Sequence, residues 1–137
     1  GLQNASFLRY GVMHRNTFLD STKLLDSTFC LKSDNRIYFA GQMTGVEGYM
    51  ESAASGLLAG INAARLYRGQ PLLTLSPETM MGALAGYISG GTTADFQPMG
   101  ANFGILPPLE ETIRDKRQRY AALAQRALDR LAETTDR

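Results

Sequence analysis

The amino-acid sequence predicts an α/β fold in a single segment, residues 1–137. A continuously apolar run, "IYFA" at 37–40, is typical of a strand that is covered on both faces. A glycine-bearing loop, "GQMTGVEG" at 41–48, follows it, and three segments further on carry apolar residues at helical spacing. No internal repeat or low-complexity linker divides the chain, so we expect no domain boundary inside it.

Residues 1–46 are expected to form strands and loops. Pairs of aspartate with serine or asparagine recur in this part of the chain and are turn signals. The runs "TFCLK" at 28–32 and "RIYFA" at 36–40 have strand character. We therefore expect two strands joined by a turn at 33–35.

A helix is predicted over residues 47–68, with Gly69 and Pro71 as its stop signals. Apolar residues recur along it at helical spacing and predict a buried side, made of Met50, Ala53, Ala54, Leu57, Leu58, Ile61 and Ala64. Gly56 and Gly60 each cost about 1 kcal/mol relative to alanine in a helix interior. Two such costs on one stripe indicate close approach to a neighbouring element.

Two further helices are predicted. Ser76 has the character of an N-cap and Pro77 suits the first helical position, which predicts a helix over 76–89. The last helix follows two consecutive prolines and is predicted over 108–134. Its apolar positions form one stripe: Leu109, Ile113, Tyr120, Leu123, Ala124, Ala127, Leu128 and Leu131.

Composition bounds the class of protein. The chain has 137 residues, of which 44% are hydrophobic and 20% charged, as in an ordinary globular domain. Its net charge of +1 gives no global attraction to nucleic acid or membrane, and no apolar run approaches the roughly 18 residues of a membrane span. One cysteine cannot form an internal disulfide, which favours a reducing, cytoplasmic setting. The chain begins with Gly1 rather than methionine, which leaves open that it is part of a longer protein.

The predicted strand, glycine loop and helix have the layout of a nucleotide or cofactor site. In α/β proteins the ligand lies outside the carboxyl end of a strand, where N–H groups at a helix start face it. Gly41, Gly45 and Gly48 would let the backbone turn sharply and approach such a ligand. Their spacing, G-x-x-x-G-x-x-G, is not the G-x-G-x-x-G dinucleotide fingerprint. A turn that serves only chain reversal is the alternative interpretation.

Four motifs resemble the C-terminal part of the folate- and flavin-dependent tRNA uracil-5-methyltransferases. They are "YGVMHRNTF", "IYFAGQMTGVEGYMESAASGLLAGINAAR", "SPETMMGALAGYI" and "FGILPPL". The resemblance extends from Gly1 to about Leu109. It implies the C-terminal part of a Rossmann-like FAD-binding domain, of the glutathione-reductase-like flavoprotein type, that ends in a long C-terminal helix.

The resemblance also implies an activity. This family places a methyl group on C5 of the T-loop uridine of tRNA, at position 54 in standard tRNA numbering. The implied cofactors are FAD, methylenetetrahydrofolate and NADH or NADPH; the implied partners are tRNA and an upstream remainder of the same enzyme, with no membrane and no metal. Related flavoproteins that modify the wobble uridine of tRNA share the G-Q-x-x-G framework and are an alternative, although they are not expected to carry "GVMHRNTF".

Six residues are carried over by motif to the flavin-side loop and the start of the cofactor-side helix: Gly41, Gln42, Thr44, Gly45, Gly48 and Tyr49. Backbone N–H groups there would meet the flavin ring and its ribityl chain, while Tyr49 could stack on an aromatic face. Gln42 offers an uncharged amide where many related flavoproteins have an acidic residue. The family resemblance therefore gives the glycine loop a cofactor-binding role.

His14, Arg15 and Asn16 form a second polar cluster, expected near the cofactor. The resemblance suggests contacts to folate, nicotinamide or the target base, and Arg15 could pair with a carboxylate or a phosphate. A lone histidine is more often structural, which is the alternative.

No catalytic residue is assigned in this chain. The family's first G-x-G-x-x-G motif and its nucleophilic cysteines belong upstream. Cys30 lies in an alternating, strand-like run and is interpreted as a core thiol. We therefore expect the isolated chain to be inactive and to hold one wall of the flavin site.

The last predicted helix carries the densest basic run, "RDKRQR" at 114–119. On a helical wheel Lys116, Arg119, Arg126 and Arg130 fall within about 80°, beside the apolar stripe. A solvated flank is the simplest interpretation, because acidic residues nearby offset the charge. Phosphate contact with tRNA is the alternative. It also underlies a second hypothesis, in which the chain is a non-catalytic RNA-binding module.

Overall fold

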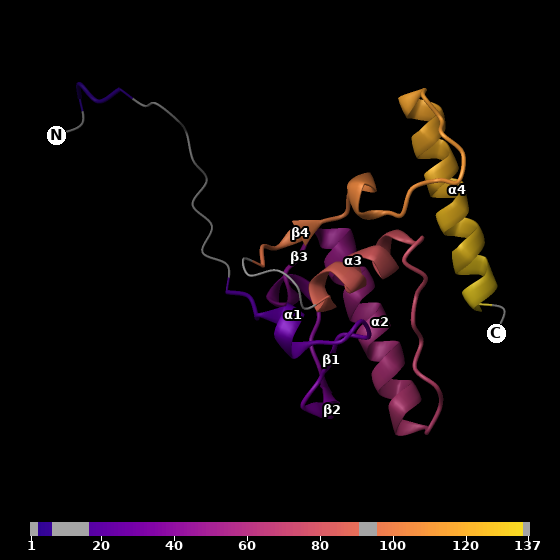
Figure 1. Ribbon diagram of the computed structural model, residues 1–137. Helices are drawn as coiled ribbons and strands as arrows, with labels where there is room; N and C mark the ends of the chain where they lie inside the picture. Colours follow the sequence, from indigo (N-terminus) through magenta and orange to yellow (C-terminus); the bar gives the residue numbers. More distant parts are fainter. Residues whose placement is uncertain (1–2, 7–16, 91–95, 136–137) are drawn as a thin grey trace.

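The computed structural model describes residues 3–6, 17–90 and 96–135, which combine helices with small sheets (Figure 1). In chain order the elements are α1 (Ser21–Leu24), β1 (Cys30–Leu31), β2 (Asp34–Tyr38), the 3-10 helix η1 (Gly41–Thr44), β3 (Val46–Glu47), α2 (Tyr49–Tyr67), α3 (Met80–Ser89), β4 (Met99–Gly100), the 3-10 helix η2 (Phe103–Ile105) and α4 (Lys116–Thr135). The predicted α/β class with a long C-terminal helix is confirmed. None of the helices in these described ranges combines the length and the apolar character that a membrane span needs.

The sheets among the described residues are small. β1 pairs with β2 in antiparallel fashion, whereas β3 and β4 are parallel, with Val46 opposite Met99. The turn between β1 and β2 lies earlier than predicted. It is formed by Lys32 and Ser33, because Asp34 already pairs within β2.

The apolar run at 37–40 is not a strand covered on both faces, so that expectation is wrong. β2 ends at Tyr38, and Ile37 is 41% exposed. Within the described ranges β2 pairs with β1 alone, and a two-stranded sheet leaves much of its surface open. The apolar character of this run therefore exceeds what the described fold buries.

α2 buries a different side from the one predicted. Its buried residues are Ser55, Leu58, Ala59 and Asn62. Of the apolar residues expected to be buried, Leu58 alone is, while Met50 and Leu57 are 80% and 66% exposed. The close neighbour expected at Gly56 and Gly60 is also absent from the described structure, since an added Cβ at either glycine would meet nothing within 4 Å.

Two polar residues lie on the buried side of α2 because each is hydrogen-bonded there. Ser55 Oγ accepts the N–H of Gly41 at 2.8 Å. The Asn62 amide donates to the carbonyl of Leu73 at 2.9 Å and accepts the Leu73 N–H at 2.6 Å. A buried polar group that is fully paired carries little cost, so polar side chains can occupy the core here.

α3 begins later than the predicted helix over 76–89. Thr79 is its N-cap, and Thr79 Oγ1 accepts the N–H of Gly82 at 3.1 Å. Ser76 lies in the preceding turn, where its carbonyl accepts the Thr79 N–H at 2.9 Å and the Thr79 hydroxyl at 2.7 Å. The predicted capping role of Ser76 therefore belongs to Thr79.

α4 also begins later than the predicted helix over 108–134. Asp115 Oδ1 accepts the Gln118 N–H at 2.8 Å, as an N-cap side chain does. The segment from Pro107 to Asp115 runs back alongside α4, with the Arg126 guanidinium donating to the carbonyls of Pro107 and Pro108 at 2.6 and 2.8 Å (Figure 1). The two prolines favour this extended backbone over a helix.

Two apolar clusters hold these elements together. The larger contains Phe29, Val46, Leu58, Ala59, Leu84, Ala85, Ile88 and Phe96. The smaller contains Ala83, Leu106 and Leu123 and joins α4 to α3. The glycine loop rests on the larger cluster through Val46 and Phe96.

Candidate functional site

The glycine loop connects β2 to the N-terminus of α2 and comprises η1, Gly45, β3 and Gly48 (Figure 1). The φ angles of Gly41, Gly45 and Gly48 are 71°, 86° and 106°. L side chains rarely adopt such values, so the path of this loop depends on its glycines.

Gly45 packs against Phe96. A Cβ at Gly45 would overlap the Phe96 ring, closer than real contacts allow. The Gly45 carbonyl accepts the Met99 N–H at 2.9 Å, beside the pairing of β3 with β4. Gly45 therefore shapes the loop on its buried side, because the lack of a side chain lets the backbone lie directly on the segment that leads into β4.

Hydrogen bonds fix the first half of the loop. The Thr44 hydroxyl, which is fully buried, donates to the Gly41 carbonyl at 2.7 Å. The Gly41 N–H donates to Ser55 Oγ, whose hydroxyl in turn donates to the Ser52 carbonyl at 2.8 Å. The loop is thus tied to the first turns of α2, and sequence reasoning had not assigned Ser55 this role.

Glu51 ties the same region to the segment after β4. Its Oε1 accepts the N–H of Ala101 at 3.1 Å, across fifty positions of sequence. Its carboxylate also lies close to Gly48, where a Cβ would meet it. The sequence signal for Glu51 was only that of an acidic residue in a first helical turn, which the helix dipole favours.

The N-terminus of α2 is the open side of this site. Gly48 occupies the N-cap and has no side chain with which to accept the first-turn N–H groups. Gln42 is exposed, and Tyr49 is 97% exposed. A helix start of this kind carries a partial positive charge and suits a ligand with hydrogen-bond acceptors.

The second predicted cluster, His14, Arg15 and Asn16, lies outside the described residues. The structure therefore gives these three residues no position relative to the glycine loop.

The four basic residues of α4 have two different environments. Arg126 donates to the carbonyls of Pro107 and Pro108, lies 3.4 Å from Glu78 Oε1, and its side chain is 18% exposed. Arg130 bonds Glu78 Oε2 at 2.5 Å and Glu133 at 3.1 Å. The Arg130 hydrogen bond lowers the pKa of Glu78 below its ordinary value. Both arginines therefore hold α4 in place.

Lys116 and Arg119 lie nearer the start of α4. Lys116 is exposed, and its Nζ lies 5.6 Å from the centroid of the Tyr120 ring. Arg119 is half-buried, donates to the Ile113 carbonyl at 3.2 Å, and lies 5.7 Å from the same ring. Only Lys116 of the four predicted contacts presents a charge without a described hydrogen bond or ion pair to a protein group.

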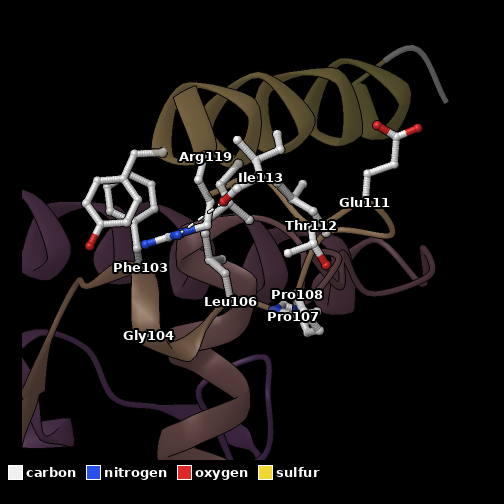
Figure 2. A pocket seen from close by; sticks show the side chains of 12 residues that line it. Phe103, Gly104, Leu106, Pro107, Pro108, Glu111, Thr112, Ile113 and Arg119 are labelled. Atoms are coloured by element: carbon white, nitrogen blue, oxygen red, sulfur yellow. Dashed lines mark hydrogen bonds between the residues drawn. The ribbon is translucent and has the colours of Figure 1, made fainter. Parts of the chain in front are cut away.

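A hollow of about 400 Å³ lies between α4 and the segment 103–113. Figure 2 shows Arg119 reaching to Ile113 on one side of it and the two prolines on another. Its lining is mostly apolar, with Glu111 and Arg119 as its charged members, and includes no residue of the glycine loop. We assign no ligand to it.

Comparison with known proteins identifies the family. The sequence profile described as "Glucose inhibited division protein A" matches residues 1–71, which is more than half of the 137 residues and includes the whole glycine loop. The chain belongs to the glucose inhibited division protein A family.

Individual relatives show which members of the family the chain resembles. The chain is 58% identical over 135 residues to "Methylenetetrahydrofolate--tRNA-(uracil-5-)-methyltransferase TrmFO" of Brevibacillus brevis, which covers 98% of this chain and 31% of that relative. It is 59% identical over 129 residues to the protein of the same name from Enterococcus faecalis, covering 94% of the chain and 30% of the relative. These matches confirm the resemblance drawn from the motifs, and this member of the family spans just under a third of the length of those relatives.

The single cysteine of this family member is buried. Cys30 is 3% exposed, and its Sγ lies 3.7 and 3.9 Å from the carbonyls of Leu31 and Asp34. Burial raises the pKa of the Cys30 thiol, and the negative charge of Asp26 raises it further. A nucleophilic cysteine needs the opposite shift, so these surroundings suit a core thiol.

Proposed function

We propose that this chain supplies one wall of the flavin site in a flavoenzyme that methylates C5 of the T-loop uridine, position 54, of tRNA. One observation carries the proposal: an open helix start preceded by glycines at positive φ, in a chain 58% identical to a methylenetetrahydrofolate--tRNA-(uracil-5-)-methyltransferase. In this proposal the chain is the C-terminal part of a Rossmann-like FAD-binding domain, and the reaction takes place in the cytoplasm. The upstream remainder of the enzyme provides the rest of the site and the nucleophilic cysteines.

The residues of the glycine loop fit a flavin. Gly41 and Gly48 keep Cβ atoms away from the helix start, and the first-turn N–H groups of α2 are suitable donors to flavin oxygens and nitrogens. Exposed Gln42 can donate from its amide, and exposed Tyr49 can stack on an aromatic face. Thr44 and Gly45 are buried, so they hold the loop in shape behind the contact surface.

The bound cofactors would supply the chemistry. FAD would deliver the reducing electrons, drawn from NADH or NADPH, that turn the methylene group of methylenetetrahydrofolate into the methyl group of the product. This chain's own part would be to bind and orient the flavin and to keep water from one side of it. His14, Arg15 and Asn16 are proposed contacts to folate, nicotinamide or the target base.

The basic residues of α4 support a smaller role in tRNA binding. Lys116 is the best placed for a phosphate contact, with Arg119 behind it. Arg126 and Arg130 are engaged with Glu78 and the proline carbonyls, so their contribution would be to hold α4. This division disfavours the alternative of a non-catalytic RNA-binding module acting through this helix, because two of its four basic residues are engaged within the chain.

A chimera tests the proposed reaction. The chain would replace its 135 matched residues in the Brevibacillus brevis relative, and the chimera would be expressed in a bacterium that lacks 5-methyluridine in its tRNA. We expect the purified chimera to be yellow and mass analysis of tRNA nucleosides to show 5-methyluridine at position 54. A wobble-uridine modification in its place would assign the chain to the related wobble-modifying flavoproteins. A colourless chimera that modifies no tRNA would contradict the proposal.

A further inference from the structure

One side of α2 is apolar and uncovered in the described structure. We call it the open face of α2; its members are Met50, Ala53, Leu57, Gly60 and Ala64. They recur at steps of three and four residues, so they form a single stripe along the helix. Met50 and Leu57 are 80% and 66% exposed, and an added Cβ at Gly60 would meet nothing within 4 Å.

The residues of the open face are not those of a surface that normally faces solvent. It carries no charged residue, and the only charged residues of the whole helix are Glu51 and Arg65. The opposite side, with Leu58 and Asn62, is already buried. A helix that is apolar on most of its circumference is normally covered on most of it. The sequence pattern thus encodes a second buried side.

Small residues make this face suitable for close packing. Ala53, Gly60 and Ala64 are small, with Ala53 between the larger side chains of Met50 and Leu57 and the other two beyond Leu57. Glycine in a helix interior is destabilising relative to alanine, so its presence there indicates that another backbone or side chain approaches closely. Within the described residues no such neighbour reaches Gly60, so the element that packs against it lies outside them.

The length of the relatives indicates what covers it. The matched region is 31% of the Brevibacillus brevis protein and 30% of the Enterococcus faecalis protein, so more than two thirds of each lies outside it. The open face starts at Met50, within one helical turn of Gly48, so whatever covers it also lies beside the glycine loop.

We propose that the open face of α2 is an intramolecular interface, packed against the part of the same polypeptide that lies outside these 137 residues. The inference rests on the proposed function in taking the chain as one portion of a longer enzyme. The further step is that the remaining portion of the enzyme packs against α2 along its length. It thereby covers the flavin site on the side of Tyr49.

Thiol labelling of the chimera described above tests this interface. Ala53→Cys and Ala64→Cys each place a small thiol on the open face with minimal change in volume. Ala121→Cys is the matched control, because Ala121 is an exposed helical alanine on α4 beside polar neighbours. Maleimide labelling would be measured at each peptide by mass spectrometry, together with the flavin content of the same sample.

We expect both open-face thiols to label at least about tenfold more slowly than the control, because labelling then requires local opening. Labelling of both at the control rate would overturn the interface, even in a yellow and active chimera. Protection that disappears on dilution would assign the face to a second copy of the protein and would also overturn the proposal. Slow labelling in a chimera without flavin would uphold the interface while contradicting the proposed function, so the two failures are distinguishable.

Discussion

At the residue scale, Gly45 illustrates how a glycine in a cofactor-like loop can be required by packing. Its φ of 86° lies in the left-handed region, and the Phe96 ring occupies the space where a side chain would go. Gly60 is the opposite case, with helical backbone and open space around it. The same residue type therefore has opposite expected responses to substitution at the two positions.

Gly45→Ala should lower the free energy of unfolding of the chain by about 2–4 kcal/mol, the sum of left-handed strain and overpacking against Phe96. Gly60→Ala should raise it by up to about 1 kcal/mol, because alanine is the better helix former. Urea denaturation of the two variants measures both values. Adding Phe96→Leu to Gly45→Ala should recover the overpacking part; no recovery would show that Phe96 is not the cause.

Sequence reasoning located the glycine loop but misjudged which residues are buried around it. Ser55 and Asn62 are polar, so a hydrophobic pattern passes over them, yet their hydrogen bonds to Gly41 and Leu73 make their burial favourable. Glu51 and Phe96 were missed because their partners, Ala101 and Gly45, are about fifty positions away. Contacts at that separation leave no local signal in the chain.

At the scale of elements, the helix types were predictable and their first residues were not. Ser76 is by residue type the better N-cap, and only the three-dimensional turn selects Thr79 in its place. α4 begins at Lys116 rather than at residue 108. The segment before it is held in an extended form by hydrogen bonds from Arg126, which lies more than two turns into the helix. Residues that cap a helix give a local signal in the sequence. The contacts that decide between two possible caps are made in the tertiary structure and give none.

Glu78→Gln should loosen the attachment of α4. Glu78 pairs with both Arg126 and Arg130, and its pKa is lowered by the Arg130 hydrogen bond, so the carboxylate form is favoured in the folded state. This contribution is fully present above the ordinary glutamate pKa of 4.5 and is lost as the pH falls through the lower, folded value. The urea midpoint of Glu78→Gln should therefore lie below that of the parent at pH 7, and the difference should shrink progressively below pH 4.5.

Glu133→Gln is the matched control for that measurement. Among the described residues Glu133 pairs with Arg130 alone, and its side chain is 60% exposed, so its loss should change the midpoint little. A difference for Glu78→Gln that persists unchanged at acid pH would contradict the ion-pair account of how α4 is held.

At the scale of the whole molecule, the sequence predicted more burial than the described fold contains. The run at 37–40 and the open face of α2 both have the composition of covered surfaces, yet Ile37 is 41% exposed and Met50 is 80% exposed. The α/β class and the placement of the glycine loop between β2 and α2 were predictable because they depend on local periodicity and glycine spacing. The layers that cover these surfaces were not predictable, because a sequence pattern indicates that a face is buried but does not identify the element that buries it.

The most direct test of the flavin-site assignment uses residues whose loss should not affect folding. Gln42 and Tyr49 are exposed at the open side of the glycine loop, so a Gln42→Ala, Tyr49→Ala double variant of the chimera should keep its stability. Gln70→Ala, just beyond the end of α2, is the matched exposed control. Flavin affinity measured by absorbance titration should fall about tenfold or more in the double variant, from lost stacking and hydrogen bonding, and stay unchanged in the control. Equal flavin affinity in all three proteins would contradict the assignment of the glycine loop to the flavin.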